Sequence, residues 1–167
     1  ELTENVVDRI LSAQNLAAIT IIFPILKAFH EMGHAYAVKR WGGEVHEMGI
    51  MLLVLMPIPY VDASGASAFR DRRQRLLVGG AGMMVELFIA ALALHLWVNI
   101  GEGYVRSALF NIIVLASIST ILFNANPLLR YDGYYILSDW LEISNLAQRS
   151  LEYLGYLFKR YLFGVQD

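Results

Sequence analysis

Three long apolar segments constrain the fold of this chain more than any other feature. They cover residues 16–38, 76–100 and 105–123. At about 1.5 Å per residue, a helix of this length can span the roughly 30 Å hydrocarbon core of a bilayer. The chain is 57% hydrophobic and only 17% charged, which leaves more apolar surface than one small soluble domain can bury. We therefore expect an all-α integral membrane protein with about three transmembrane helices.

Two further segments complete the expected architecture. Residues 48–60 are apolar but short, and Pro57 and Pro59 interrupt them. We expect a re-entrant or β-hairpin-like element at about residues 45–62, packed against protein. Residues 134–163 mix aromatic and charged side chains at helical spacing, which is typical of interfacial helices. We expect residues 1–167 to form a single membrane-embedded core domain, and the acidic, polar start of the chain favours a fragment of a longer protein.

The distribution of charge predicts an orientation and excludes some partners. If the chain crosses the membrane three times, most basic residues fall on one side, including a basic loop at residues 69–75, and this side should be cytoplasmic. Its members are Lys39, Arg40, Arg70, Arg72, Arg73, Arg75 and Arg130, whereas Arg9 and Arg106 fall on the other side. A net charge of −2 suggests no nucleic-acid partner. The chain has no cysteine, so a transition-metal site would have to use histidine and carboxylate ligands.

One pentapeptide in the first apolar segment carries the clearest chemical signal. It reads His30-Glu31-Met32-Gly33-His34. Histidines at positions i and i+4 of a helix lie on one face, so both imidazoles can reach one zinc ion. Glu31 lies beside that face and can take a proton from water and pass it to a leaving amine. This is the zinc metalloprotease pattern. The alternative is that interhelical hydrogen bonds satisfy all three side chains, but ionisable groups inside a membrane helix usually have a function.

A catalytic zinc also needs a third protein ligand and an open coordination position. The candidates that we consider are His46, Glu47, Asp62 and Asp132. His46 and Glu47 follow the Gly42-Gly43 break, and they can reach the site only if the chain doubles back. Asp62 is a rival ligand, although we favour a role at the end of the hairpin.

A second motif makes the sequence resemble a known family. The spacing is N-x-x-P-x-x-x-x-D-G, and the residues that match it are Asn124, Pro127, Asp132 and Gly133. With His30, Glu31 and His34, they make the chain resemble the site-2 protease family of intramembrane zinc metalloproteases (peptidase family M50). Residues 56–63 and 126–135 make the bacterial branch of peptide zinc metalloproteases the most similar. The resemblance covers most of the chain, but residues 101–103 are too few to hold a PDZ-like insert.

The resemblance implies a chemistry and a cellular setting. It implies a zinc ion held by His30, His34 and Asp132, with Glu31 as catalytic base, in an endopeptidase that cleaves membrane-associated substrates near the cytoplasmic face. The expected partners are the lipid bilayer, a peptide or transmembrane-segment substrate and proteins of an export system. The expected location is the bacterial inner (cytoplasmic) membrane, with the active site towards the cytoplasm.

One alternative is a non-hydrolytic membrane component of a peptide export or efflux system with a structural zinc. Another is a metal transporter, but the second and third apolar segments offer few polar residues for an ion path.

Four more polar residues lie in the apolar segments or at their ends. Glu86 can hold a metal-ligating histidine as its hydrogen-bond partner, or it can pair with another helix. Asn124 matches a family residue thought to help hold the substrate or its oxyanion, although asparagine also favours helix C-termini. We expect His95 to be a hydrogen-bonded or interfacial histidine. Lys27 lies one turn before His30, where a cation would repel zinc unless it pairs with Glu31 or reaches the interface.

Overall fold

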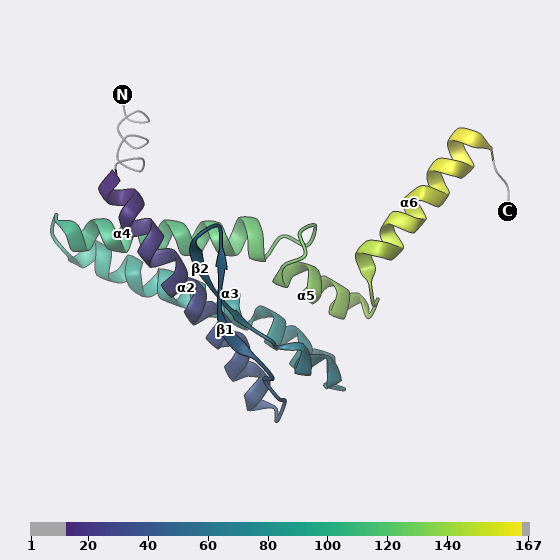
Figure 1. Cartoon of the computed structure of the whole chain (residues 1–167), viewed down its shortest axis with the longest axis horizontal. Helices are drawn as coiled ribbons and strands as arrows, with labels where there is room; N and C mark the ends of the chain where they lie inside the picture. The colour runs from purple at the N-terminus through teal and green to yellow at the C-terminus, as the bar shows by residue number, and fades with distance from the viewer. Residues whose placement is uncertain (1–12, 165–167) are drawn as a thin grey trace.

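The computed structural model describes residues 13–164 as a helical bundle with smaller elements attached to it (Figure 1). Residues 1–12, which include Arg9, lie outside the described part. The bundle consists of α2 (Ala13–Arg40), α3 (Arg72–Asn99) and α4 (Tyr104–Ile118), which continues into the π-helical segment η2 (Ser119–Asn124). The smaller elements are β1 (Met48–Leu53), β2 (Met56–Val61), the 3₁₀ helix η1 (Ser64–Ala68), α5 (Asp132–Leu141) and α6 (Leu146–Phe163).

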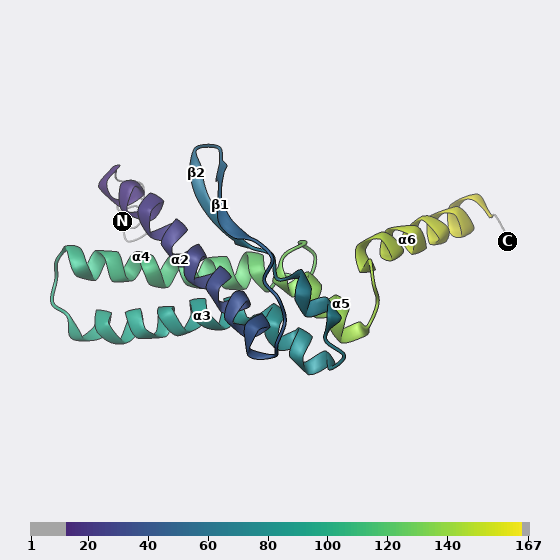
Figure 2. The ribbon, with the colours of Figure 1, turned by 60° about the horizontal axis from the view of Figure 1, so that its bottom comes forward.

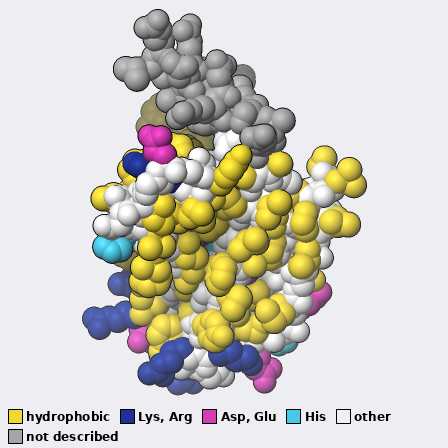
Figure 3. Space-filling view, turned by 90° about the vertical axis from the view of Figure 1, so that its left-hand side faces the viewer, with side chains coloured by type: hydrophobic (Ala, Val, Ile, Leu, Met, Phe, Trp, Pro, Cys, Tyr) yellow, Lys and Arg dark blue, Asp and Glu magenta, His cyan; other side chains and the backbone are white. Residues whose placement is uncertain are grey.

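Among the described residues, three helical stretches are long and apolar enough to cross a membrane, and they match the three predicted segments. They are Asn15–Arg40, Arg72–Asn99 and Tyr104–Asn124. Figure 3 shows hydrophobic side chains spread over one face of the bundle, with Lys and Arg side chains gathered towards its lower edge. The prediction of a basic loop through residue 75 was wrong in extent, because Arg72 begins α3. The Asp71 carboxylate caps the first turn of α3 by accepting a hydrogen bond from the backbone N–H of Arg73 at 2.8 Å.

Helix α3 is central because both other long helices pack against it. Its buried residues lie three or four positions apart, so they form one continuous line along the helix. They are Val78, Gly82, Glu86, Ala90 and Ala93. Small residues let the helices approach closely, as expected from the glycines near the start of this segment. A Cβ atom on Gly33 of α2 would lie only 2.9 Å from the carbonyl oxygen of Ala81. The backbones of α2 and α3 are therefore in contact at the histidine pentapeptide.

The element expected at residues 45–62 is an antiparallel β-hairpin. Met48 pairs with Val61 at its base and Leu53 pairs with Met56 at its tip. The turn residues Val54 and Leu55 have φ values of 50° and 67°, and each is 92% exposed. Strand β2 contacts α2, and the hairpin projects beside that helix in both ribbon views (Figures 1 and 2). Both expected prolines lie in β2. Each strand of a two-stranded sheet has one unpaired edge, where the backbone N–H that proline lacks is not needed.

The C-terminal region forms two helices, α5 and α6, where one or two were expected. Helix α5 packs against the start of α3. The guanidinium of Arg75 lies 3.1 Å from the Asp139 carboxylate, and Arg72 donates a hydrogen bond to the carbonyl oxygen of Trp140 at 3.1 Å. Helix α6 extends away from the bundle (Figure 2). The basic residues at the start of α3 thus fix the helix that begins with Asp132.

Candidate metal centre

Two histidines and one aspartate converge at the end of the bundle that carries α5. The Nε2 atoms of His30 and His34 lie 3.1 Å apart. Oδ2 of Asp132 lies 3.0 Å from Nε2 of His30, and Oδ1 lies 3.5 Å from Nε2 of His34. One ligand atom from each of the three residues lies within 4.8 Å of the others. Donor atoms this close together on three side chains are able to hold one metal ion.

The histidines reach the cluster because helical spacing places both rings on one face of α2. Their ring centroids are 4.8 Å apart, and only 3% of His30 and 7% of His34 is exposed. The absence of a side chain at Gly82 makes room for the ring of His30, since a Cβ atom there would lie 2.5 Å from its Cδ2 and Cε1 atoms. A glycine on α3 is therefore part of the centre, although the sequence alone linked it only to helix packing.

Hydrogen bonds at the opposite ring nitrogens direct both Nε2 atoms towards the cluster. Nδ1 of His34 lies 2.7 Å from the carbonyl oxygen of Val78. Because a carbonyl oxygen can only accept, Nδ1 carries a proton, and in the neutral imidazole Nε2 keeps its lone pair. Nδ1 of His30 lies 3.3 Å from Oε1 of Glu86. A carboxylate or carbonyl behind each imidazole is the arrangement that orients histidine ligands in metal sites.

Asp132 reaches the histidines because the chain turns sharply after η2. The first residue of α5 is Asp132, and Gly133 packs so closely on the preceding turn that a Cβ atom would lie 2.5 Å from the carbonyl oxygen of Ala125. Burial acts to raise the pKa of Asp132, but its contacts with His30 and His34 outweigh burial and hold this pKa well below its usual range. The side chain is therefore an anion.

The residues of the cluster fit a divalent metal ion. Oδ2 of Asp132 is buried and accepts no well-directed hydrogen bond, although Nε2 of His30 lies 3.0 Å from it, and a buried oxygen normally has such a partner. Around the imidazoles lie the carboxylates of Glu31, Glu86 and Asp132 and the ammonium of Lys27. With neutral imidazoles, these groups leave two negative charges in excess, which one divalent cation balances. Two imidazoles and a carboxylate are a donor set that suits zinc.

Glu31 and Asn124 lie at the centre without being among the three converging residues. Glu31 is partly buried, and its carboxylate interacts electrostatically with His34, His30 and Asp132. Asn124 is buried in η2, and its amide nitrogen lies 3.3 Å from Oε2 of Glu86. It also lies 3.5 Å from Nδ1 of His30. Asn124 therefore contacts the groups behind His30.

The remaining candidates from the sequence lie elsewhere. His46 is exposed and lies 3.9 Å from Glu44. Glu47 accepts a hydrogen bond from the Tyr60 hydroxyl. The Asp62 carboxylate accepts one from the backbone N–H of Ser64, and the Ser64 side chain together with this N–H lowers the pKa of Asp62. This is the role at the end of the hairpin that we favoured. The structure does not bring these residues into the cluster. His95 is exposed and is also outside it.

Sequence reasoning missed the partner of Lys27. The two suggested solutions were a pair with Glu31 or an extended side chain at the interface. Instead, the ammonium lies 2.8 Å from Oε1 of Glu86. Two isolated, opposite charges in neighbouring apolar segments were the signal that could have identified this pair, because unpaired charges are costly there.

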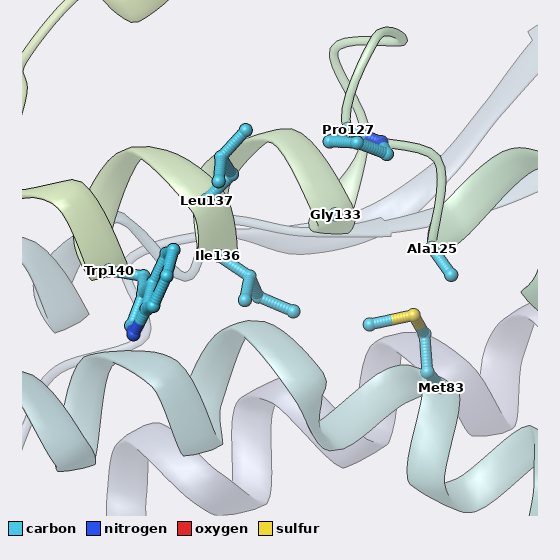
Figure 4. Close-up of a pocket in the computed structure, with 7 residues that line it drawn as sticks. All are labelled: Met83, Ala125, Pro127, Gly133, Ile136, Leu137 and Trp140. Carbon is cyan, nitrogen blue, oxygen red and sulfur yellow. The ribbon is translucent and has the colours of Figure 1, made fainter.

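An apolar pocket lies between α3, the turn at Ala125 and Pro127, and α5 (Figure 4). Its volume is about 360 Å³. Three of its residues directly follow residues of the centre, since Met83, Ala125 and Gly133 come after Gly82, Asn124 and Asp132. The lining residues are Met83, Ala125, Pro127, Gly133, Ile136, Leu137 and Trp140.

Comparison with known proteins supports a metalloprotease-type relation at low identity. The chain is 28% identical over 131 residues to a protein of Bacillus subtilis (strain 168) named "Putative peptide zinc metalloprotease protein YydH". The match covers 78% of this chain and 50% of that protein, so the chain spans about half the length of this relative. No family model matches the chain. No solved structure matches it either.

Proposed function

We propose that this chain is the membrane-embedded core of a zinc-dependent intramembrane endopeptidase of the site-2 protease type. One observation carries the proposal. Nε2 of His30, Nε2 of His34 and the Asp132 carboxylate converge within the helical bundle, with Glu31 beside them. Two histidines, a carboxylate and a neighbouring glutamate are the groups that metal-assisted hydrolysis of a peptide bond requires. The relative named as a zinc metalloprotease supports the same reading.

Each residue has a distinct role in this proposal. His30, His34 and Asp132 hold the zinc ion, which when bound supplies Lewis-acid activation of water and of the scissile carbonyl. Glu31 accepts the proton of the attacking water and delivers it to the nitrogen of the leaving peptide. Val78 and Glu86 hold the histidine rings through their Nδ1 atoms. Asn124 contributes by fixing Glu86.

The substrate is a membrane-associated peptide or a transmembrane segment. The centre is formed by long apolar helices, so a substrate that reaches it from the lipid phase must be apolar. Its scissile amide must leave the helical conformation, because a helix buries its amides in internal hydrogen bonds. The apolar pocket at Met83 and Trp140 suits an apolar substrate side chain next to the cleaved bond. The basic residues at this end of the bundle favour a cytoplasmic position for the centre.

The test is cleavage by the purified protein in liposomes with added zinc. Hydrophobic peptides derived from bacterial membrane proteins serve as substrates, and mass spectrometry detects new termini. We expect Glu31→Gln to retain zinc but to cleave at least about 10²–10⁴ times more slowly, because the proton acceptor is lost. Glu102→Gln makes the same change in an exposed turn and should cleave like the wild type.

Equal cleavage by Glu31→Gln and the wild type would contradict a hydrolytic role for Glu31. The same variant separates the alternative function. If the protein is a non-hydrolytic component of an export system, Glu31→Gln leaves export intact and the wild type shows no cleavage.

A further inference from the structure

Lys27 brings a positive charge into the middle of α2, one turn before His30. Its side chain is only 14% exposed. The ammonium lies 2.8 Å from Oε1 of Glu86 and 2.6 Å from the hydroxyl of Ser119. If this cation acted on a neighbouring metal ion through its charge alone, it would weaken metal binding. Its contacts indicate a different role.

The Glu86 carboxylate is fixed by three donors in addition to its contact with His30. Its side chain is fully buried, with 0% exposed. Oε1 accepts from Lys27, whereas Oε2 accepts from the Thr120 hydroxyl at 2.6 Å and from the Asn124 amide at 3.3 Å. Oε1 also lies 3.3 Å from Nδ1 of His30, on the side of the ring away from the cluster. These donors keep the carboxylate behind His30 and out of the metal cluster itself.

The π-helical segment η2 supplies the Thr120 and Asn124 donors, and its Ser119 hydroxyl oxygen accepts from the Lys27 ammonium. Ser119, Thr120 and Asn124 all belong to it. A π-helical turn shifts side chains relative to a regular α-helix, and such turns occur frequently at functional sites. Groups from α2, α3 and η2 thus meet around one carboxylate, and each is held by a hydrogen bond.

We propose that Lys27 is a positioning residue of the metal centre, whose ammonium holds the Glu86 carboxylate against Nδ1 of His30. This inference rests on the proposed function, because it assigns a role within the same zinc site. With Glu86 held in place, His30 keeps Nε2 towards His34 and Asp132. The positive charge of Lys27 also compensates the negative charge of Glu86. The divalent ion then has to balance only the charges of Glu31 and Asp132.

Positioning and simple repulsion predict opposite changes in zinc affinity when Lys27 is removed. Lys27→Met keeps an unbranched side chain but removes the charge and the donors. Positioning predicts that the zinc dissociation constant rises about 10–100-fold, which is the usual effect of losing a group that orients a metal ligand. Repulsion alone predicts that the dissociation constant falls. Lys39→Met is the matched control, because it makes the same change at the exposed end of the same helix.

A double variant covers the case in which Lys27→Met does not fold because the Glu86 carboxylate is left unpaired in the interior. Lys27→Met combined with Glu86→Met removes both charges. We expect this variant to keep its helical circular dichroism, to bind zinc about 10–100-fold more weakly and to change the visible absorption spectrum of the cobalt-substituted protein. A purely structural pair would leave that spectrum unchanged.

Zinc affinity is measured by competition with a chromogenic chelator in detergent. Wild-type affinity and an unchanged cobalt spectrum in the double variant would overturn the inference, as would tighter zinc binding by Lys27→Met. If the wild type binds zinc and cleaves peptides while Lys27→Met behaves like Lys39→Met, only the role of Lys27 fails. If the wild type binds no zinc, the proposed function fails as well.

Discussion

Replacing Gly82 by alanine should damage the metal centre, whereas the same change two residues earlier should not. A Cβ atom on Gly82 would lie 2.5 Å from the Cδ2 and Cε1 atoms of the His30 ring, while ordinary van der Waals contact begins at 3.4 Å. The ring would have to retreat by at least about 0.9 Å, the difference between these two distances, because its Nε2 atom lies closer still. A Cβ atom on Gly80 meets nothing within 4 Å.

The displacement sets the size of the expected effect. Functional constellations tolerate shifts of about 0.5 Å, and a misplacement of about 1 Å can cost 10²-fold. We therefore expect Gly82→Ala to weaken zinc binding by about 100-fold. Gly80→Ala should bind zinc normally and stabilise the protein by about 0.4–1 kcal/mol, since alanine favours the helix.

Two measurements on each variant test this reasoning. Competition with a chromogenic chelator gives the zinc dissociation constant, and circular dichroism gives the midpoint of thermal unfolding. If Gly82→Ala binds zinc as tightly as Gly80→Ala, the ring of His30 does not lie against Gly82. The arrangement of α2 and α3 described above would then be incorrect at the centre.

Two further predictions concern the support of Asp132 and the metal itself. Arg75→Met removes the contacts of this guanidinium with the Asp139 carboxylate and the Phe69 carbonyl oxygen. We expect it to destabilise the protein by about 1–2 kcal/mol and to weaken zinc binding. The control Arg73→Met changes an exposed position and should do neither. Equal thermal midpoints and zinc affinities in the two variants would refute this prediction. Removing zinc with 1,10-phenanthroline should lower the thermal midpoint because it takes away an ion that binds only the folded chain. Restoring zinc to about 100 times its dissociation constant should return about 2.7 kcal/mol of stability. If the midpoint of thermal unfolding is the same with and without the chelator, no ion stabilises the fold.

Features that depend on local spacing were predictable from the sequence. The apolar lengths predicted three helices, and three described helices have the required length and hydropathy. The two prolines predicted an interrupted segment, and a hairpin occupies it. The spacing of His30 and His34 predicted two imidazoles on one face, and their Nε2 atoms lie 3.1 Å apart. Each of these features follows from the geometry of a single segment.

Features that depend on how segments pack were mostly not predictable from spacing, and the convergence of Asp132 with the two histidines was implied only by the family resemblance. Lys27 and Glu86 are 59 residues apart, and their pairing requires the crossing of α2 and α3 that Gly33 permits. The π-helical form of residues 119–124 arises at the end of an otherwise regular apolar helix, and it brings Thr120 to Glu86. The carbonyl of Val78 behind His34 has no signature in the sequence, because every residue carries a carbonyl. These contacts decide which ring nitrogens face the cluster.

The most direct test of the central claim is the zinc content of the purified protein. Inductively coupled plasma mass spectrometry would compare the wild type with His34→Ala and Asp132→Ala, and His46→Ala would serve as the control because His46 is exposed and outside the cluster. A single three-ligand site predicts about one zinc ion per chain in the wild type and in His46→Ala, and little zinc in the other two variants. Full zinc content in Asp132→Ala, or none in the wild type after reconstitution, would contradict the metal centre described here.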